Sequence, residues 1–336
     1  MNIVRVALAV PLPRFFDYLY STDLTPIVGG RVLVPFGSQK RVGIVVDLPA
    51  SSDVAKEKLK PIIDVLDADS LFNSTTWDWL AWSANYYRAA LGDVLFQALP
   101  VKLRNGESAV KNDRTFWRIT DLGKQALESG ELKRAKKQIE ALNLLLTQDL
   151  EKGNNEISSA IWSALKGKDY VEEIIVPTEQ KSWQQALGDN PLVNLDNRLT
   201  LNKQQALAFS QLLFQEGFNV WLLEGVTGSG KTEIYLQYIE EVLKKGKQVL
   251  VLVPEIGLTP QTVRRFQDRF NVEIDVLHSN LNDTQRLNVW ERARTGQSAI
   301  VIGTRSALFT QFSDLGLIIL DEEHDGSFKQ QDGWRY

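Results

Sequence analysis

The chain has 336 residues, a net charge of −4 and no cysteine. This length predicts two or three domains, and the lack of cysteine excludes disulfides and thiolate zinc sites within these residues. No apolar run approaches the roughly 20 residues of a membrane span, and the start lacks the pattern of a secretory signal, so we expect no membrane partner and a cytoplasmic location. The net charge argues weakly against nucleic-acid binding, although a local basic groove is sufficient for it.

The first 105 residues predict a small β-rich domain. Stretches of β-branched and aromatic residues are bounded by glycine and proline, which is typical of short antiparallel strands in a barrel-like sheet. These stretches lie at residues 4–10, 15–20, 31–36 and 41–47. Residues 74–98 then predict one helix, because apolar residues recur at helical spacing after Ser74, a suitable N-cap.

Residues 106–197 predict a compact module between polar linkers. The expected elements are two helices and a strand, at residues 132–150, 156–165 and 170–176, and the expected linkers are 103–115 and 177–197. Helix, helix and strand in this order fit a winged-helix module, a variant of helix-turn-helix. A helical spacer would give a similar pattern, and the residues alone leave both interpretations open.

Residues 198–336 predict a doubly wound α/β domain with a parallel sheet, because apolar strands and amphipathic helices alternate. The expected strands are 220–223, 248–253, 273–277, 299–302 and 317–320. The expected helices run from the glycine-rich loop described next to residue 243, from 259 to 270 and from 283 to 294.

A glycine-rich loop with the pattern G-x-x-x-x-G-K-T opens this domain. Its members are Gly225, Val226, Thr227, Gly228, Ser229, Gly230, Lys231 and Thr232. Glycines allow the sharp turn that aims backbone N–H groups at phosphate oxygens, and the helix that follows presents its positive end to the same place. Lys231 is then expected to reach the β- and γ-phosphates, and Thr232 to supply a hydroxyl to Mg²⁺.

An acidic cluster, Asp-Glu-Glu-His at residues 321–324, follows the last apolar strand. Ligand sites in open α/β sheets form at the carboxyl ends of strands, so we expect Asp321 beside the phosphate loop as a Mg²⁺ ligand. Glu322 is placed to orient or deprotonate the attacking water, and His324 could couple the nucleotide to a moving element. The sequence contains no Asn-Lys-x-Asp motif for reading guanine, which favours ATP over GTP.

Strand, phosphate loop and acidic box together resemble a superfamily-two helicase. Such helicases carry an adenine-reading glutamine about twenty residues before the loop, and Gln205 matches it. Residues 253–261 resemble helicase motif Ia and residues 302–308 resemble motif Ib, which touch the DNA backbone in that superfamily. Thr304 and Arg305 offer a hydroxyl and a planar cation for that contact.

The strings at residues 226–233, 253–261, 277–279 and 321–325 resemble the PriA-type replication-restart helicases more closely, as do Pro11–Leu19 and Gly92–Pro100. The resemblance covers essentially the whole chain. It implies three units: a domain that binds the 3′ end of a nascent strand (1–105), a winged helix (106–197), and a first, RecA-like helicase lobe (198–336).

The family also implies two DNA sites. One is a pocket for the terminal base and 3′-hydroxyl, which the resemblance maps to Phe16, Asp17, Tyr18, Gly37 and Lys60. The other is an aromatic-rich loop after the acidic box, which it maps to Phe328, Lys329 and Trp334. Aromatic rings stack on bases and cations meet phosphates, so these residue types suit the roles.

Motifs of a second helicase lobe and the family's cysteine-rich zinc module are missing from this sequence, so we expect a fragment that binds ATP and Mg²⁺ but hydrolyses ATP poorly. The expected function is an ATP-dependent 3′→5′ DNA helicase that recognises forked DNA with a 3′ end at the junction and binds single-stranded DNA. Single-strand DNA-binding protein and primosome components are partners implied by the resemblance. A duplex-translocating remodelling ATPase and a fork-recognition module without unwinding remain alternatives.

Overall fold

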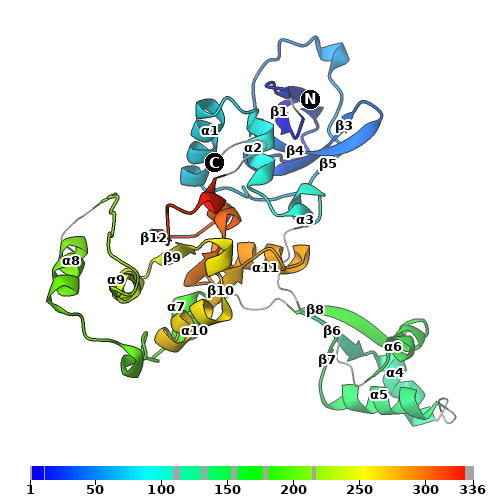
Figure 1. The fold of residues 1–336 in the computed structure, drawn as a ribbon. Helices are drawn as coiled ribbons and strands as arrows, with labels where there is room; N and C mark the ends of the chain where they lie inside the picture. Colours follow the sequence, from blue (N-terminus) through cyan, green and yellow to red (C-terminus); the bar gives the residue numbers. More distant parts are fainter. Residues whose placement is uncertain are drawn as a thin grey trace. The chain divides into compact units, whose positions relative to one another are not determined.

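The structure is a computed structural model that describes residues 2–10, 12–108, 114–129, 132, 135–152, 157–176, 181–213 and 217–329. The chain divides into two compact units, one formed by residues 1–109 and 181–336 and the other by residues 110–180 (Figure 1). The boundaries predicted at residues 105 and 197 for a three-domain division stay a prediction.

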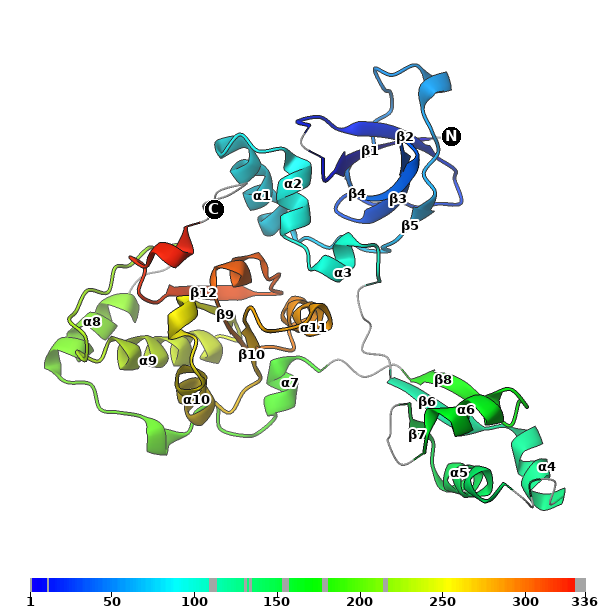
Figure 2. The same cartoon turned by 45° about the vertical axis from the view of Figure 1, so that its right-hand side comes forward.

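The amino-terminal part of the first unit is a β-barrel-like domain, as the stretches of β-branched and aromatic residues bounded by glycine and proline predict (Figure 2). Its antiparallel sheet has the order β2-β1-β4-β3-β5. The strands are β1 (Asn2–Leu8), β2 (Phe16–Tyr20), β3 (Arg31–Phe36), β4 (Gln39–Asp47) and β5 (Asp64–Val65). The segment that leads into β5 forms hydrogen bonds with both β2 and β3. Ile62 N–H donates to the Leu19 carbonyl of β2 at 2.9 Å, and Ile63 N–H donates to the Leu33 carbonyl of β3 at 2.8 Å.

Three helices follow the barrel: α1 (Ser74–Tyr86), α2 (Leu91–Gln97) and α3 (Val101–Arg104). The expectation of one helix over 74–98 is wrong, because α1 ends in a Schellman-type turn. Ala89 N–H donates to the Ala84 carbonyl at 2.9 Å, and Arg88 takes a left-handed φ of 54°. The N-cap is also one residue earlier than expected, since the Asn73 side chain accepts from Thr76 N–H at 2.8 Å.

Arg88 holds the position in this turn that glycine usually takes. A non-glycine residue in the left-handed region costs on the order of 1 kcal/mol. The backbone conformation at this position therefore favours glycine, but the sequence has arginine.

The unit formed by residues 110–180 combines a three-stranded antiparallel sheet with three helices. The strands are β6 (Arg114–Ile119), β7 (Leu150–Glu151) and β8 (Val171–Val176), in the order β7-β6-β8. The helices are α4 (Asp121–Ser129), α5 (Lys136–Thr147) and α6 (Ser159–Lys166). Trp117 of β6 stacks on Trp162 of α6 with ring centroids 5.3 Å apart, which joins sheet and helices in one core.

The sequence pattern missed β6 and α4 in this unit, and it made the first expected helix too long. α5 begins at Lys136 rather than 132, because a turn precedes it in which Ala135 N–H donates to the Leu132 carbonyl at 2.8 Å. Three helices with a small antiparallel sheet are the content of a winged-helix module.

The remaining part of the first unit is a three-layer α/β domain. Four parallel strands have the order β10-β11-β9-β12. They are β9 (Gln248–Leu252), β10 (Ile274–Leu277), β11 (Ile300–Gly303) and β12 (Leu315–Leu320). The helices are α7 (Trp183–Leu187), α8 (Lys203–Leu213), α9 (Lys231–Lys244), α10 (Pro260–Arg269) and α11 (Asp283–Arg294).

Successive residues of β9 point to opposite faces of the sheet, as the strand period requires. Val249 and Val251 pack into the core cluster that holds α9 and α10. Leu250 and Leu252 pack into the cluster that holds α11. Helices thus cover both faces, which confirms the predicted α/β class with a parallel sheet.

The strand expected at residues 220–223 is not formed. Val220 is 83% exposed and Leu222 is 73% exposed, and the segment has no ladder partner in the sheet. A run of apolar, β-branched residues reports the propensity for a strand, but a strand exists only where a neighbour accepts its hydrogen bonds. The expected parallel sheet therefore has four strands in this structure rather than five.

Candidate functional site

The phosphate loop ends at the first residue of α9, the helix that packs on β9. Gly230 is the N-cap of α9 with a φ of 84°, and Gly228 has a φ of 80°. The positive φ of Gly230 favours glycine at this position, and a Cβ there would also displace the side-chain amide of Gln205. The loop thereby ends at the positive end of a 14-residue helix, a suitable place for an anion.

Gln205 ties α8 to this loop. Its Nε2 donates to the Ser229 carbonyl at 2.8 Å, and its Oε1 accepts from Asn202 N–H at 2.9 Å. Asn202 Oδ1 accepts from Gln205 N–H in return at 3.0 Å, which is the reciprocal pattern of a capping box. The amide is thus occupied at both ends, and its expected role in reading adenine stays a prediction.

Lys231 and Asp321 lie on the same side of the sheet. Lys231 Nζ donates to the Gly225 carbonyl at 2.5 Å, so the ammonium folds back over the loop. Asp321 follows β12, and its N–H donates to the Leu252 carbonyl at the end of β9 at 2.9 Å. The two groups are close enough for the charge of Lys231 to lower the pKa of Asp321.

The pKa of Asp321 is nevertheless raised overall. Burial of its carboxylate is the main cause and the negative charge of Glu322 is the second. A divalent cation bound at this half-buried carboxylate would stabilise its charged form, because the positive charge would offset both the burial and the repulsion by Glu322. Hydroxyl and carboxylate oxygens such as those of Thr232 and Asp321 are the donors that Mg²⁺ prefers.

Tyr235 is a site residue that the sequence analysis missed. Its hydroxyl donates to Asp321 Oδ2 at 3.3 Å. Burial, together with the charge of Asp321, raises the pKa of Tyr235 to about 12, while the Thr232 side chain acts in the opposite direction. Tyr235 therefore lies between the two expected Mg²⁺ ligands, and its position three residues after Thr232 on α9 is the signal that could have revealed it.

Glu322 lies in a left-handed conformation with a φ of 52°, a non-glycine residue in the region that favours glycine. Its side chain is exposed, and His324 Nε2 lies 3.7 Å from its Oε2. His324 Nδ1 lies 3.6 Å from Glu323 Oε2, so the histidine ring lies beside two carboxylates of the acidic cluster. A water-orienting role of Glu322 remains a prediction.

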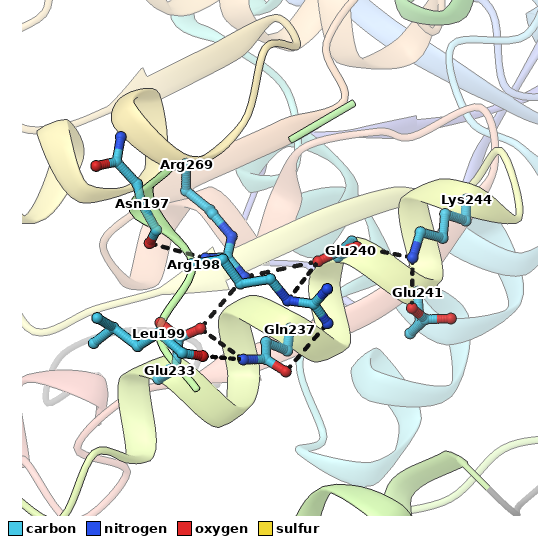
Figure 3. A network of polar contacts seen from close by, with 9 residues as sticks. All are labelled: Asn197, Arg198, Leu199, Glu233, Gln237, Glu240, Glu241, Lys244 and Arg269. Carbon is cyan, nitrogen blue, oxygen red and sulfur yellow. Dashed lines mark hydrogen bonds and ion pairs between the residues drawn. The ribbon is translucent and has the colours of Figure 1, made fainter. Parts of the chain in front are cut away.

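A buried polar network joins α9 to α10 behind the phosphate loop (Figure 3). Arg269 of α10 is 1% exposed, and its Nη1 donates to the Asn197 carbonyl at 2.9 Å. Its Nη2 lies 3.3 Å from Glu233 Oε1 and 3.7 Å from Glu240 Oε2. Gln237 completes the network by donating to Glu233 Oε1 at 2.8 Å. Glu233 comes two residues after Lys231, so the network fixes the first turn of the nucleotide helix.

The expected motif Ib residues lie at the carboxyl end of β11. Thr304 is buried and Arg305 Nη1 donates to the Ser327 carbonyl at 3.2 Å. This bond connects motif Ib with the loop after the acidic box. In that loop Phe328 packs partly buried against the core and Lys329 is exposed, while Trp334 lies outside the described residues.

In the barrel, Phe16 and Tyr18 share one face of β2 and Asp17 points to the other, because strand residues alternate. Phe16 meets Phe36 edge to face with centroids 5.2 Å apart. The Tyr18 hydroxyl donates to the Pro35 carbonyl at 3.2 Å. These aromatic residues therefore gather at the β3–β4 hairpin.

The Asp17 carboxylate is already bonded in this structure. Arg5 Nε donates to its Oδ1 at 2.8 Å, and the Ser52 hydroxyl donates to its Oδ2 at 2.6 Å. The Arg5 hydrogen bond is the main reason why the pKa of Asp17 lies below its ordinary value. The structure therefore separates Asp17 from the aromatic rings of the expected end pocket.

Gly37 and Lys60, the other two residues of the expected end pocket, lie in different segments of the barrel. Gly37 has a φ of 60° in the two-residue turn between β3 and β4, and nothing lies within 4 Å of a Cβ built on it. The Lys60 carbonyl accepts from Leu19 N–H at 2.9 Å, so its position is fixed beside β2 while its side chain is exposed.

Protonation of Asp321 is expected to control binding of the nucleotide's metal. Because the pKa of Asp321 is raised, its protonation begins at a higher pH than for an ordinary aspartate, so affinity for Mg·ATP should fall as the solution is made mildly acidic. Without metal, the stability of the fold depends on pH in the opposite direction. A carboxylate whose pKa is raised in the folded state stabilises the fold fully below its unfolded pKa, and this contribution is lost as pH rises through the folded pKa.

Asp321→Asn is therefore expected to match or exceed the wild type in thermal stability at neutral pH without Mg²⁺, and to lose the stabilisation that Mg·ATP provides. Thermal melts with and without Mg·ATP across this pH range measure both effects. Equal shifts by Mg·ATP in the two proteins would refute the role of Asp321.

No helix within the described ranges is long and apolar enough to cross a bilayer. Among the described residues, no group of three or more histidine and acidic side chains is arranged to hold a metal by itself. The candidate Mg²⁺ site consequently depends on the phosphates of a nucleotide for most of its ligands, as is usual for this ion.

Comparison with protein families finds two matches. The model of the PriA 3′DNA-binding domain matches residues 5–100, and the DEAD/DEAH box helicase model matches residues 202–336. The first includes the barrel with α1 and α2, and the second includes the phosphate loop and the acidic box.

Among individual proteins, the chain is 76% identical over all 336 residues to replication restart protein PriA of Haemophilus influenzae and covers 46% of that protein. It is 35% identical over 344 residues to replication restart protein PriA of Buchnera aphidicola, again with 100% of this chain and 46% of the relative covered. The protein of the same name from Synechocystis is 34% identical over 401 residues, with 96% and 48% covered. The chain spans about half the length of the relatives it matches.

Proposed function

We propose, from the chain's membership of the PriA replication restart proteins, that it forms the fork-recognising and ATP-binding part of an ATP-dependent 3′→5′ DNA helicase. The observation that carries this proposal is the placement of Lys231 within electrostatic range of Asp321 at one edge of a parallel sheet. The chain joins this site to a 3′DNA-binding domain, a combination that suits a motor loaded at DNA ends.

The nucleotide half of the proposal assigns each residue one task. The backbone of the loop and the N-terminus of α9 bind the phosphates, and Lys231 moves from the Gly225 carbonyl to the β- and γ-phosphates. Thr232 and Asp321 hold the metal, and Tyr235 orients the Asp321 carboxylate toward it. Bound Mg²⁺ would offset the negative charge of the phosphates. Glu322 orients the attacking water.

Coupling to DNA would follow from the polar contacts around this site. ATP binding is proposed to close the helicase domain over single-stranded DNA, and hydrolysis to reopen it. The Arg305–Ser327 contact joins motif Ib to the loop after the acidic box, so a change at Asp321 can reach a DNA-contacting cation through the short segment between Asp321 and Ser327. Because the chain covers about half of its relatives' length, we propose slow ATP turnover by these residues alone.

The end-recognition half places the terminal base against Phe16 and the open surface above Gly37, with Tyr18, which is 5% exposed, in the core beneath them. Stacking on aromatic rings is sequence-tolerant, as recognition of any 3′ end requires. Lys60 would meet a phosphate. Asp17 would accept the 3′-hydroxyl in place of the Ser52 hydroxyl, since both are neutral O–H donors to the same carboxylate.

Asp17→Asn is expected to reduce the preference for a fork that ends in a 3′-hydroxyl over one that ends in a 3′-phosphate. A charged hydrogen bond contributes roughly 1.5–3 kcal/mol, so the ratio of the two dissociation constants should fall by about tenfold or more. Fluorescence anisotropy with the two forks measures the ratio, and Asp47→Asn, which alters another carboxylate near Arg5, is the matched control. An unchanged ratio would remove Asp17 from the end pocket.

Two alternatives keep the same nucleotide site. A remodelling ATPase would move on duplex DNA without separating strands, and a fork-recognition module would use the loop only as a switch. Strand-displacement and ATPase assays on the complete protein distinguish them: the helicase separates strands, the remodelling enzyme hydrolyses ATP without separating them, and the switch does neither. Single-strand DNA-binding protein and primosome components are proposed as partners of the complete protein.

A further inference from the structure

A cavity of about 950 Å³ lies on the barrel domain between the β3–β4 hairpin and helices α1 to α3. The hairpin contributes Lys40 and Arg41, the α1–α2 turn contributes Tyr87 and Arg88, and α2 and α3 contribute Asp93 and Arg104. We refer to the space enclosed by these six residues as the hairpin pocket. It differs from the expected 3′-end pocket, none of whose five assigned residues lines it.

The hairpin pocket carries an excess of positive charge, because four cationic residues line it together with one carboxylate, that of Asp93. Among the described residues, no carboxylate lies within ion-pair distance of Lys40, Arg41 or Arg88. The guanidinium of Arg104 is held in place by the carbonyls of Leu99 and Gln97, at 2.6 and 3.1 Å. Cations that converge on a concave surface from separate elements focus an attractive field for an anion.

The backbone of Arg88 provides a second, independent indication. Arg88 occupies the left-handed position after α1, where glycine would relieve the strain. Strained non-glycine residues concentrate at functional sites, where the surrounding structure holds them in place. Here the side chain in question lines the hairpin pocket.

The hairpin pocket is continuous with the hairpin that carries Gly37. The guanidinium of Arg41 lies over the Phe36 ring, 5.5 Å from its centroid, and Phe36 in turn contacts Phe16. A DNA strand that ends at Phe16 and Gly37 therefore has an adjacent cationic surface for phosphates further along.

We propose that the hairpin pocket binds backbone phosphates of the DNA strand whose 3′ end is held at the hairpin. This inference rests on the proposed end recognition and adds a second anchoring site to it. Tyr87, 45% exposed, offers a ring for stacking, and Asp93 offers an acceptor for an amino group of a base. An acidic peptide would suit the cations but has no base amino group to donate to Asp93 and no base to stack on Tyr87, so the combination favours a nucleic acid.

Arg88→Gly tests the proposal without the usual risk of unfolding, because glycine suits the backbone at this position better than arginine. The variant is expected to melt at the same or a higher temperature than the wild type, and to bind forked DNA about tenfold more weakly at moderate salt. The slope of log K against log salt concentration should become shallower by about 0.7–0.9 for each phosphate that the variant no longer binds. Salt-titrated anisotropy with the 336-residue chain measures both quantities.

Lys58→Ala is the matched control, since it removes one exposed cation of the same domain outside the hairpin pocket. Equal affinities and slopes for Arg88→Gly and Lys58→Ala would overturn the proposal. The proposal would also be overturned if a polyglutamate peptide of equal charge displaced the DNA from the wild type but not from Arg88→Gly.

The failure of end recognition gives a different result. If the wild type binds 3′-hydroxyl and 3′-phosphate forks equally, the proposed end pocket fails. A reduction of affinity in Arg88→Gly that is equal for both forks would still support phosphate binding in the hairpin pocket.

Discussion

In the complete protein, replacing Lys231 by alanine is expected to lower DNA-stimulated ATP turnover by about 10²–10³-fold, the usual effect of removing one group that stabilises developing charge. Lys231 is the cation of the phosphate loop and lies in electrostatic range of Asp321, so its loss removes the ammonium expected at the β- and γ-phosphates. Asp321→Asn should lower turnover similarly, because it removes a metal ligand. Affinity for forked DNA in the absence of nucleotide should stay unchanged in both variants.

Lys245→Ala is the matched control for Lys231→Ala, because it removes an exposed lysine from the far end of the same helix. Steady-state ATPase and DNA binding are measured side by side for all three variants and the wild type. Turnover of Lys231→Ala in the range of this control would remove the phosphate loop from the catalytic site, and the motor interpretation with it. Loss of DNA binding in Lys231→Ala would instead indicate a folding defect.

The nucleotide site was predictable because its chemistry is local in sequence. The loop from Gly225 to Thr232 and the box at Asp321 each combine a fixed spacing with a neighbouring strand or helix. Parallel strands bring their carboxyl ends to one edge, so two motifs about ninety residues apart could be expected to meet. Tyr235 escaped prediction because tyrosine is ordinary on a helix and only the fold brings it to Asp321.

The elements that were not predicted depend on distant partners. β6 begins in the last two residues of the expected linker at 103–115 and continues through residues for which no element was expected, and it is a strand because β7 and β8 pair with it on both sides. The run at 220–223 shows the reverse case, a strand pattern without a partner. The break after α1 is also invisible in the pattern, since Arg88 occupies a position where glycine would have indicated the helix end.

The polar network behind the phosphate loop is a further case of residues that only the fold brings together. Arg269 and Glu233 are distant in sequence, and neither belongs to a motif that predicts burial. In the structure they link the nucleotide helix α9 to α10, the helix that follows motif Ia (Figure 3). The network therefore connects the part of the domain expected to bind ATP with the part expected to touch DNA.

Replacing Arg269 by methionine is accordingly expected to lower the free energy of unfolding by about 3–5 kcal/mol, the usual cost of removing one partner from a buried ion pair. Arg269 is 1% exposed, and its removal leaves the Glu233 carboxylate and the Asn197 carbonyl without their cation, while Glu240 keeps Lys244 Nζ at 2.8 Å. Chemical denaturation measures the decrease. Arg264→Met on the exposed face of the same helix is the matched control, and it should change stability by less than about 0.5 kcal/mol.

A second set of variants separates the ion pair from simple packing. Glu240 Oε2 and Arg269 Nη2 are close enough for attraction but are not aligned for a hydrogen bond, so the network depends on charge more than on geometry. Adding Glu233→Gln to Arg269→Met should therefore restore part of the stability, because Glu233 no longer has a cationic partner and the substitution makes it neutral, whereas Glu240 keeps Lys244. If the double variant is no more stable than Arg269→Met, the arginine stabilises the domain through packing of its aliphatic chain. In that case the electrostatic link between α9 and α10 is refuted.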